Sequence, residues 1–444
     1  MPSRALTAVG LLLTCGSIAA AVDLSQGWPH WRGPLDNGVA PHGRPPIRWS
    51  ETNNVRWKTP LPGKGHSSPI VIDGKVFVTA AIPFGPETKP VYSGAEGAHD
   101  NFPVKQAHRF VVIAVDAATG KIAWQTAVKE TFPHEGGHYT GSLASNSPVT
   151  DGERLYADFG SRGLYCLDFD GRVVWQKELG RLNTRHAHGE GSSPAVSGRH
   201  LLVNRDHEKQ STLTALDKRD GKVIWQRPRD EMTSWSSPLV VTVDGRRQVV
   251  VSATGAIRGY ELESGAELWR CGGLSRNVVA SPVYGDGVLY AANSYDWQAL
   301  LAIRLAGARG DLTDTEAVIW KRNRLTPYVP SPLLYDGRLC FLRHNQNILS
   351  MIDPKTGEDL EGPFRLGGIR EVFASPVAAG GRVYITDRSG NTLVLGLGES
   401  TEFLGVNHLE DSFSASAAIV GDALYLRGER HLYCLAAKDP DQER

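Results

Sequence analysis

Short apolar runs alternate with glycine turns along most of the chain. Runs such as KVFVTA (75–80) and RVYITD (382–387) follow a glycine turn and are rich in β-branched and aromatic residues, which favours β-strands. Asp-Gly pairs, as at 73–74 and 336–337, come directly after short apolar segments. They favour tight hairpins, because aspartate and glycine both accept the positive φ that the two central residues of such a turn need. No stretch of this region spaces its apolar residues like a helix. The pattern therefore predicts an all-β protein.

These strands recur as one unit. A Ser-Pro marker opens each copy, and the marker prolines at 194, 238 and 282 are 44 residues apart. Four apolar runs and two glycine turns follow each marker, which predicts a four-stranded antiparallel blade. Repeats of this length are typical of β-propellers. The full set of markers predicts eight blades, at Pro69, Pro148, Pro194, Pro238, Pro282, Pro332, Pro376 and the degenerate Ala417.

The last copy lacks its fourth strand. After HLYCL (431–435) the chain turns polar, whereas NVRWKTPL (54–61) carries a strand pattern with no copy of its own. We therefore expect Trp57 to lie in the outer strand of the eighth blade, so that both chain ends close the ring and no sheet edge stays free. The expected organisation is a signal peptide at 1–21, an extension at 22–53 packed on the propeller, the propeller at 54–436, and a polar tail at 437–444.

A tryptophan ends the fourth strand of most copies. Because a repeated aromatic most simply packs between neighbouring blades, we interpret this row as structural. Its members are Trp57, Trp124, Trp175, Trp225, Trp269 and Trp320.

The repeat resembles a known family. AVDAATGKIAW (114–124) and ALDKRDGKVIW (215–225) are similar to the A-x-D-x-x-T-G-K-x-x-W unit of the PQQ-like (pyrroloquinoline quinone repeat) eight-bladed propellers. That family includes quinoprotein alcohol dehydrogenases, the propeller lipoprotein of the outer-membrane barrel-assembly machinery, and many exported bacterial propellers of unassigned function. WPHWRGP (28–34) makes the chain look most like the last group. The resemblance is specific for the fold and weak for function.

Composition narrows the partners and the location. Lys+Arg and Asp+Glu are both 48, so no basic field exists to hold nucleic acid or an anionic membrane. The apolar run at 5–21 ends in Ala-x-Ala and predicts export, periplasmic or extracellular, with cleavage after Ala21. Lipid attachment at Cys15 is the alternative. We expect no transmembrane span and a monomer. The remaining cysteines, Cys166, Cys271, Cys340 and Cys434, are expected to be buried core residues.

The loops that join one blade's fourth strand (D) to the next blade's first strand (A) are the candidate binding rim. Two insertions in blade one, at 82–108 and 129–145, should lie on the same face, because loops between the second and third strands (B–C) emerge beside the D–A loops. The candidate rim residues are His66, His188, Glu190, Trp235, Arg276, Asn277, Tyr328, Arg370, Glu371 and Asp411. A ligand site is one interpretation of this rim, and a hydrated channel with mutually bonded loops is the other.

HAHGE (186–190) could indicate a metal site, but zinc needs three or four converging ligands. His66, His134 and His138 would have to join it, and only the fold can bring them there, so we predict no metal. NRDHE (204–208) is interpreted as a network that anchors loops.

Three classes of function remain open. The first, which we favour, is a non-enzymatic binding scaffold that takes a protein segment or small ligand at the D–A face without a cofactor. The second is a quinoprotein dehydrogenase. For it the resemblance implies PQQ stacked on a tryptophan, a disulfide between adjacent cysteines, and calcium held by Glu, Asn and Asp. Glu190, Asn277 and Asp411 can be nominated, but no cysteines are adjacent. The third, a hydrolase or lyase, lacks any catalytic motif.

Overall fold

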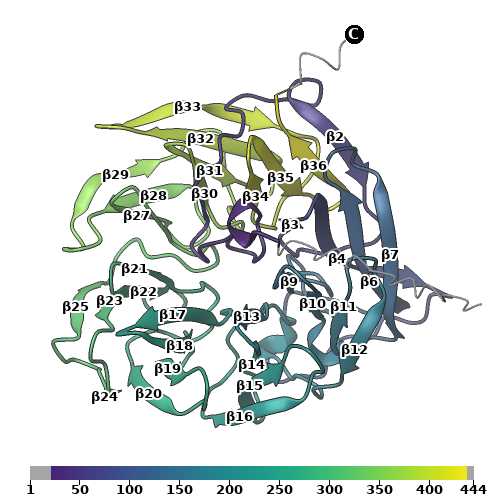
Figure 1. The fold of residues 1–444 in the computed structure, drawn as a ribbon, viewed down its shortest axis with the longest axis horizontal. Helices are drawn as coiled ribbons and strands as arrows, with labels where there is room; N and C mark the ends of the chain where they lie inside the picture. Colours follow the sequence, from purple (N-terminus) through teal and green to yellow (C-terminus); the bar gives the residue numbers. More distant parts are fainter. Residues whose placement is uncertain (1–21, 438–444) are drawn as a thin grey trace, which may run out of the picture.

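The computed structural model describes residues 22–437. The predicted signal peptide, Cys15 and residues 438–444 of the polar tail lie outside this range. Eight antiparallel sheets surround one central axis (Figure 1), and the chain follows them in order around the ring. The predicted all-β, eight-bladed propeller is confirmed. No helix within 22–437 is both long enough and apolar enough to cross a membrane.

The first four blades each contain four strands in the order A to D. Blade one has β3 (Ile70–Ile72), β4 (Lys75–Phe84), β6 (Ala107–Asp116) and β7 (Ile122–Thr131). Blade two has β9 (Val149–Thr150), β10 (Leu155–Asp158), β11 (Leu164–Leu167) and β12 (Val173–Lys177). Blade three has β13 (Ala195–Ser197), β14 (His200–Arg205), β15 (Ser211–Asp217) and β16 (Val223–Arg229). Blade four has β17 (Leu239–Val243), β18 (Arg246–Val251), β19 (Ile257–Glu261) and β20 (Glu267–Cys271).

The other four blades repeat this order. Blade five has β21 (Val283–Gly285), β22 (Val288–Asn293), β23 (Ala299–Arg304) and β25 (Val318–Arg322). Blade six has β26 (Leu333–Tyr335), β27 (Arg338–Leu342), β28 (Ile348–Ile352) and β29 (Asp359–Arg365). Blade seven has β30 (Val377–Ala379), β31 (Arg382–Thr386), β32 (Asn391–Leu397) and β33 (Thr401–His408). Blade eight has β34 (Ala418–Val420), β35 (Ala423–Arg427), β36 (His431–Leu435) and β2 (Val55–Pro60).

A few short elements depart from this plan. β24 (Gly310–Asp311) adds to the outer edge of blade four and β1 (Val39–Ala40) to the inner edge of blade seven, both in parallel, so these two sheets have five strands. β5 (Asn101–Phe102) and β8 (Gly137–His138) form a small separate sheet. The 3₁₀ turns are η1 (Leu24–Gln26), η2 (Gly160–Arg162) and η3 (Arg185–Ala187).

The ring closes through both ends of the chain, as the sequence predicted. β2 pairs antiparallel with β36, and Trp57 lies opposite Cys434. Cys434 is buried and free, as are the other three cysteines described. Closure places β2 on the otherwise free edge of β36, so the two ends of the chain share one blade.

Five tryptophans of the row each join their blade to the next one. Trp225 donates from Nε1 to the Leu262 carbonyl at 2.9 Å, in the turn between strands C and D of blade four. Gly265 of that turn has a φ of +68°, and a Cβ there would lie 2.5 Å from the indole. The same indole-to-carbonyl bond, at 2.9–3.0 Å, and the same glycine contact recur for Trp57, Trp124, Trp175 and Trp320.

Trp269 is the exception in this row. Its indole bonds the Gln248 side chain of its own blade at 2.9 Å. The next turn, RLAGARG (304–310), lacks the D-x-x-T-G pattern, so the usual glycine platform is missing. The contact between a tryptophan and the next blade, which we call the tryptophan joint, therefore needs both the aromatic residue and the matching glycine turn.

A closed ring of serines surrounds the channel. The backbone N–H of each marker serine donates to the hydroxyl of the marker serine in the next blade, at 2.9–3.1 Å, and Ser416 completes the circle by donating to Ser68. These bonds explain the Ser-Pro marker, because the serine supplies the acceptor for its neighbour's backbone. The ring serines are Ser68, Ser147, Ser193, Ser237, Ser281, Ser331, Ser375 and Ser416.

The segment at 28–34 covers one end of the channel, where the early, purple part of the chain lies near the centre of Figure 1. Trp28 is fully buried and exchanges two backbone hydrogen bonds with Val71 of strand β3. Arg32 donates to the carbonyls of the marker prolines Pro332 and Pro376 at 2.9 and 2.8 Å. This end belongs to the face made by the A–B and C–D turns, which we call the turn face. The opposite loop face carries the D–A and B–C loops.

Candidate functional site

A cavity of about 470 Å³ opens on the loop face, inside the ring of serines. All eight ring serines line it, and Trp31 of the covering segment lines it too. Its other large side chains come from loops and are mostly aromatic or imidazole groups. They are Trp235, Tyr295, Tyr328, Phe373, His66, His99, His138 and His188.

Five of the ten predicted rim residues line this cavity. They are His66, His188, Glu190, Trp235 and Tyr328. Sequence reasoning missed Trp31, His99, Tyr295 and Phe373. His99 lies in an insertion without any repeat partner, so only the fold shows where it goes. The serine lining, in contrast, was already visible as the repeat marker.

The other five predicted rim residues lie away from the cavity lining. Arg276 pairs with Asp296 at 2.7 Å near the surface, and Arg370 is exposed. Asn277 and Glu371 have positive φ values of 57° and 52°. Asp411 accepts backbone N–H groups from the loop before β36, so it anchors that loop. Equivalent positions in D–A loops of different shape do not point in the same direction, so only part of the predicted rim lines the cavity.

Trp235 is the aromatic wall of the cavity beside blade three. Its indole Nε1 donates to the Gly189 carbonyl at 2.7 Å, and its backbone N–H donates to the Val278 carbonyl at 2.8 Å. A Cβ on Gly191 would lie 3.3 Å from the ring, so the HAHGE loop runs directly beside the indole. Trp235 is therefore held in place by neighbouring loops and still faces the cavity.

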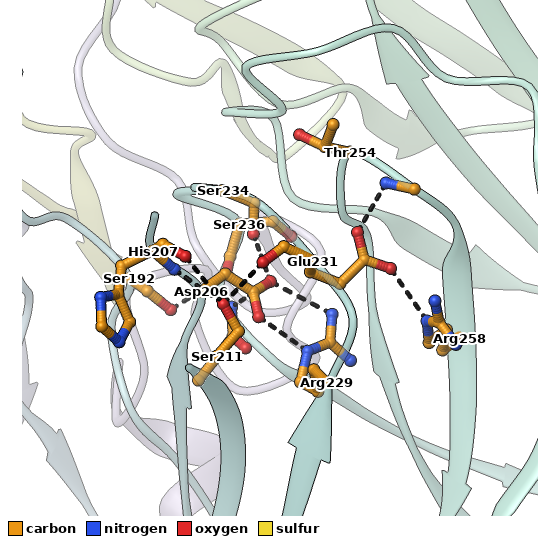
Figure 2. A network of polar contacts seen from close by, with 12 residues as sticks. Ser192, Asp206, His207, Ser211, Arg229, Glu231, Ser234, Ser236, Thr254 and Arg258 are labelled. Carbon is orange, nitrogen blue, oxygen red and sulfur yellow. Dashed lines mark hydrogen bonds and ion pairs between the residues drawn. The ribbon is translucent and has the colours of Figure 1, made fainter. Parts of the chain in front are cut away.

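A buried polar network fixes the loop that carries Trp235 (Figure 2). Arg229 and Asp206 form an ion pair at 2.7 Å with both side chains fully buried, and Ser234 donates to the same carboxylate at 2.7 Å. Ser211 donates to the Glu231 carbonyl at 2.7 Å. NRDHE (204–208) thus contributes to the scaffold behind the cavity and does not line it.

Glu190 is held by a second buried group at the cavity wall. It accepts from Arg162 Nη1 at 2.9 Å, from the Ser161 backbone at 2.8 Å and from the Ser161 hydroxyl. Burial opposes the charge of Glu190, but Arg162 and Ser161 outweigh this and keep its pKa below the usual value. Its charge is therefore already neutralised by the protein.

Among the described residues, one group of potential metal ligands has its donor atoms within 4.8 Å of one another. It consists of His134, Glu135 and Glu190. His134 Nε2 also lies 3.1 Å from the Leu182 carbonyl, and burial, together with Arg162, lowers the pKa of His134 to about 4. Because the Arg162 guanidinium already supplies the positive charge there, this group is complete without an ion.

The two insertions of blade one meet the HAHGE loop. β5 pairs with β8, which brings the insertions together, and Asn101 donates to the His186 carbonyl at 2.8 Å. The His138 backbone donates to the His188 carbonyl at 3.2 Å. The strands β4 and β6 extend into the first insertion, so its loop spans only 85–106. HAHGE is thus joined by His99 and His138, but not by His66.

The nominated quinoprotein ligands do not form a common site. Glu190 is bound to Arg162 and Ser161, Asp411 to the loop before β36, and Asn277 is buried in the loop between blades four and five. The four described cysteines lie in four different blades and are unpaired. The residues of 22–437 therefore do not fit the calcium and disulfide arrangement that the quinoprotein interpretation requires.

The fold and its repeat define an eight-bladed propeller of the PQQ-like class. A family model described as outer membrane protein assembly factor BamB matches residues 108–361 and 241–441. Because these matches cover well over half of the chain, the protein belongs to that family.

Curated relatives carry the same description. The outer membrane protein assembly factor BamB of Yersinia pestis is 25% identical over 257 residues, which cover 54% of this chain and 58% of the relative. The corresponding protein of Xanthomonas campestris pv. campestris is 26% identical over 154 residues, 34% of each chain. The matched region therefore spans less than two thirds of either relative.

Solved structures share the architecture at low identity. BamB from Moraxella catarrhalis superposes with a TM-score of 0.51 at 16% identity, covering 80% of this chain and 98% of that one. The quinohemoprotein alcohol dehydrogenase from Comamonas testosteroni gives 0.50 at 10% identity, covering 95% and 82%. An assembly factor and a dehydrogenase are equally similar in fold, so function has to be argued from the site.

Proposed function

We propose that this protein is an exported, non-enzymatic binding scaffold that takes a protein segment into the cavity on its loop face. One observation carries the proposal. The cavity is lined by Trp31 of the covering segment, by the ring serines, and by aromatic side chains of the loop face that do not follow the repeat. Tryptophan and tyrosine dominate binding energy at protein interfaces, because they bury a large area at low entropic cost.

The charge of the cavity favours an uncharged or weakly charged segment. Glu190 is the sole carboxylate in the described lining, and Arg162 compensates it. The serine ring adds hydroxyl groups that already accept a backbone N–H and still hold a proton to donate. An extended segment with aromatic or aliphatic side chains and free backbone carbonyls matches such a lining.

The family supports a protein partner. Its model and both curated relatives are described as outer membrane protein assembly factors, and assembly requires contact with other proteins. We therefore favour a partner segment from that process over a small ligand. No arrangement of described residues favours the quinoprotein alternative.

The test is a double variant on the loop face, Trp235→Ala with Tyr328→Ala. Partners cross-linked to the wild-type protein in envelope extracts would be identified by mass spectrometry and reproduced as synthetic peptides. The peptide affinity is expected to fall at least tenfold in the variant, while the melting temperature changes little, because Trp235 and Tyr328 are only partly buried.

The matched control lies on the turn face. Asp73→Asn with Asp336→Asn changes two exposed turn positions whose φ values of 48° and 50° asparagine also accepts. This control should bind the peptides normally. Loss of binding in the control together with normal binding in the loop-face variant would show that the turn face binds the peptide, which contradicts the proposal.

A further inference from the structure

Four histidines from three separate loops meet at the mouth of the cavity. His99 comes from the first insertion, His138 from the second, and His186 and His188 from the HAHGE loop. His188 lies at the centre, and its ring centroid is 4.9 Å from that of His99, 4.8 Å from that of His138 and 5.4 Å from that of His186. The rings of His99 and His186 are 4.7 Å apart. His99, His186 and His188 are therefore mutual neighbours.

The ring centres, though not yet the nitrogen atoms, lie at the separations of imidazoles that share one metal ion, because the nitrogens of these rings are not all within 4.8 Å of one another in their present orientations. Zinc binds imidazole nitrogen at about 2.0–2.1 Å in a tetrahedral arrangement, which places the centroids of two ligand rings roughly 5 Å apart. The three observed centroid distances within the His99, His186 and His188 set lie between 4.7 and 5.4 Å.

The hydrogen bonds of the rings leave nitrogen atoms available. Nδ1 of His99 and Nδ1 of His186 lie 2.8 and 2.9 Å from the same Gly97 carbonyl, so both must carry a proton there. Nε2 of His99 keeps its lone pair, and Nε2 of His186 accepts a 3.2 Å hydrogen bond from Arg185 Nε. Metal-binding histidines usually donate their second ring nitrogen to a carbonyl in this way. His188 Nε2 is buried and has no hydrogen-bond partner.

The backbone of the first insertion approaches the His186 ring closely. Gly97 permits the close approach, because its φ is +67° and a Cβ there would lie 2.9 Å from His186 Nδ1.

We propose that His99, His186 and His188 bind one divalent transition-metal ion of the zinc type at the cavity mouth, with His138 or water at the fourth position. The nitrogen atoms converge on the ion by rotation of the rings about their side-chain bonds. Binding displaces one contact, the 3.2 Å hydrogen bond from Arg185 Nε to His186 Nε2. The ion would tie both insertions to the HAHGE loop beside Trp235, so it would order the entrance of the cavity.

The test uses tag-free protein stripped with a chelator and titrated with Co²⁺, whose visible absorption reports tetrahedral nitrogen ligands, followed by displacement with Zn²⁺. We expect one equivalent to bind. His188→Ala should abolish the spectrum, and His99→Ala, at an exposed position that does not threaten folding, should weaken binding at least tenfold. His408→Ala, an exposed histidine of blade seven, should bind like the wild type.

Two further outcomes would overturn the proposal. One is the lack of a stoichiometric site in the wild-type protein. The other is normal affinity in His99→Ala together with loss in Glu135→Gln, which would place the ion at the neighbouring His134, Glu135 and Glu190 group. Peptide binding at Trp235 is a separate measurement, so failure of the metal site leaves the proposed function standing.

Discussion

The two faces of the ring use the same repeat in different ways. On the turn face five glycine turns support the tryptophan of the preceding blade, and the segment at 28–34 covers the channel. On the loop face the D–A loops have different sequences, and several polar atoms, such as His188 Nε2, have no partner within the protein. Contacts that repeat are used up by folding, whereas unpartnered groups on a rigid frame remain available for binding.

This difference predicts that changes on the turn face mainly affect stability and that changes on the loop face divide into two kinds. Glu190 and Trp235 both line the cavity, yet Glu190 lies in a buried ion pair and Trp235 is partly open to solvent. Only changes at partly exposed residues such as Trp235 should alter binding without unfolding the protein.

The largest effect is expected from removing the N-terminal region that closes the ring and covers the channel. A chain that begins at Ser67 lacks β2 and the segment at 28–34, so β36 loses its neighbour and the channel loses its cover. We expect no cooperative unfolding transition by calorimetry, whereas a chain that begins at Gly27 should melt close to the chain that begins at Val22. Similar melting temperatures for the Ser67 and Val22 chains would contradict the closure.

Next is a single tryptophan joint. Trp225→Ala removes a buried indole and its bond to the Leu262 carbonyl, and should lower the free energy of unfolding by about 3–5 kcal/mol. Urea denaturation measures this. Trp297→Ala, at an indole that is 54% exposed, should change it by less than about 0.5 kcal/mol. Equal losses of unfolding free energy in the two variants would show that the tryptophan row does not stabilise the contacts between blades.

The loop-face ion pair comes third. Glu190→Gln leaves Arg162 buried without a counter-charge and should cost about 3 kcal/mol. Glu178→Gln breaks an exposed pair with Lys129 and should cost at most about 1 kcal/mol. Chemical denaturation of the Glu190→Gln and Glu178→Gln variants measures both costs. If the Glu190 variant kept full stability, Glu190 would have no structural role.

The smallest effect is expected in the serine ring between the faces. Ser237→Ala removes the acceptor of the Ser193 backbone N–H, which is buried, and should cost about 1–2 kcal/mol. Ser400→Ala, at an exposed turn, should be neutral. If both variants denature at the same urea concentration, the ring adds nothing to stability.

The fold was predictable because its determinants are local and repeated. Short apolar runs, Asp-Gly turns and Ser-Pro markers specify strands, hairpins and ring contacts within one copy, and eight copies constrain one another. The closing strand was also predictable, because Trp57 stands at the repeat distance from Pro69. The Trp269 exception, too, corresponds to a visible change in the turn at 304–310.

The site was predictable only in part, because its members share no local pattern. By itself the sequence determined the blades, their number, the ring closure and the face on which the loops gather. Only the tertiary structure decided that Arg276 and Asp411 turn to other partners, that Glu190 is neutralised by Arg162, and that His99 reaches His188. Side-chain direction in an irregular loop depends on contacts with distant segments, and these exist only after the ring has closed.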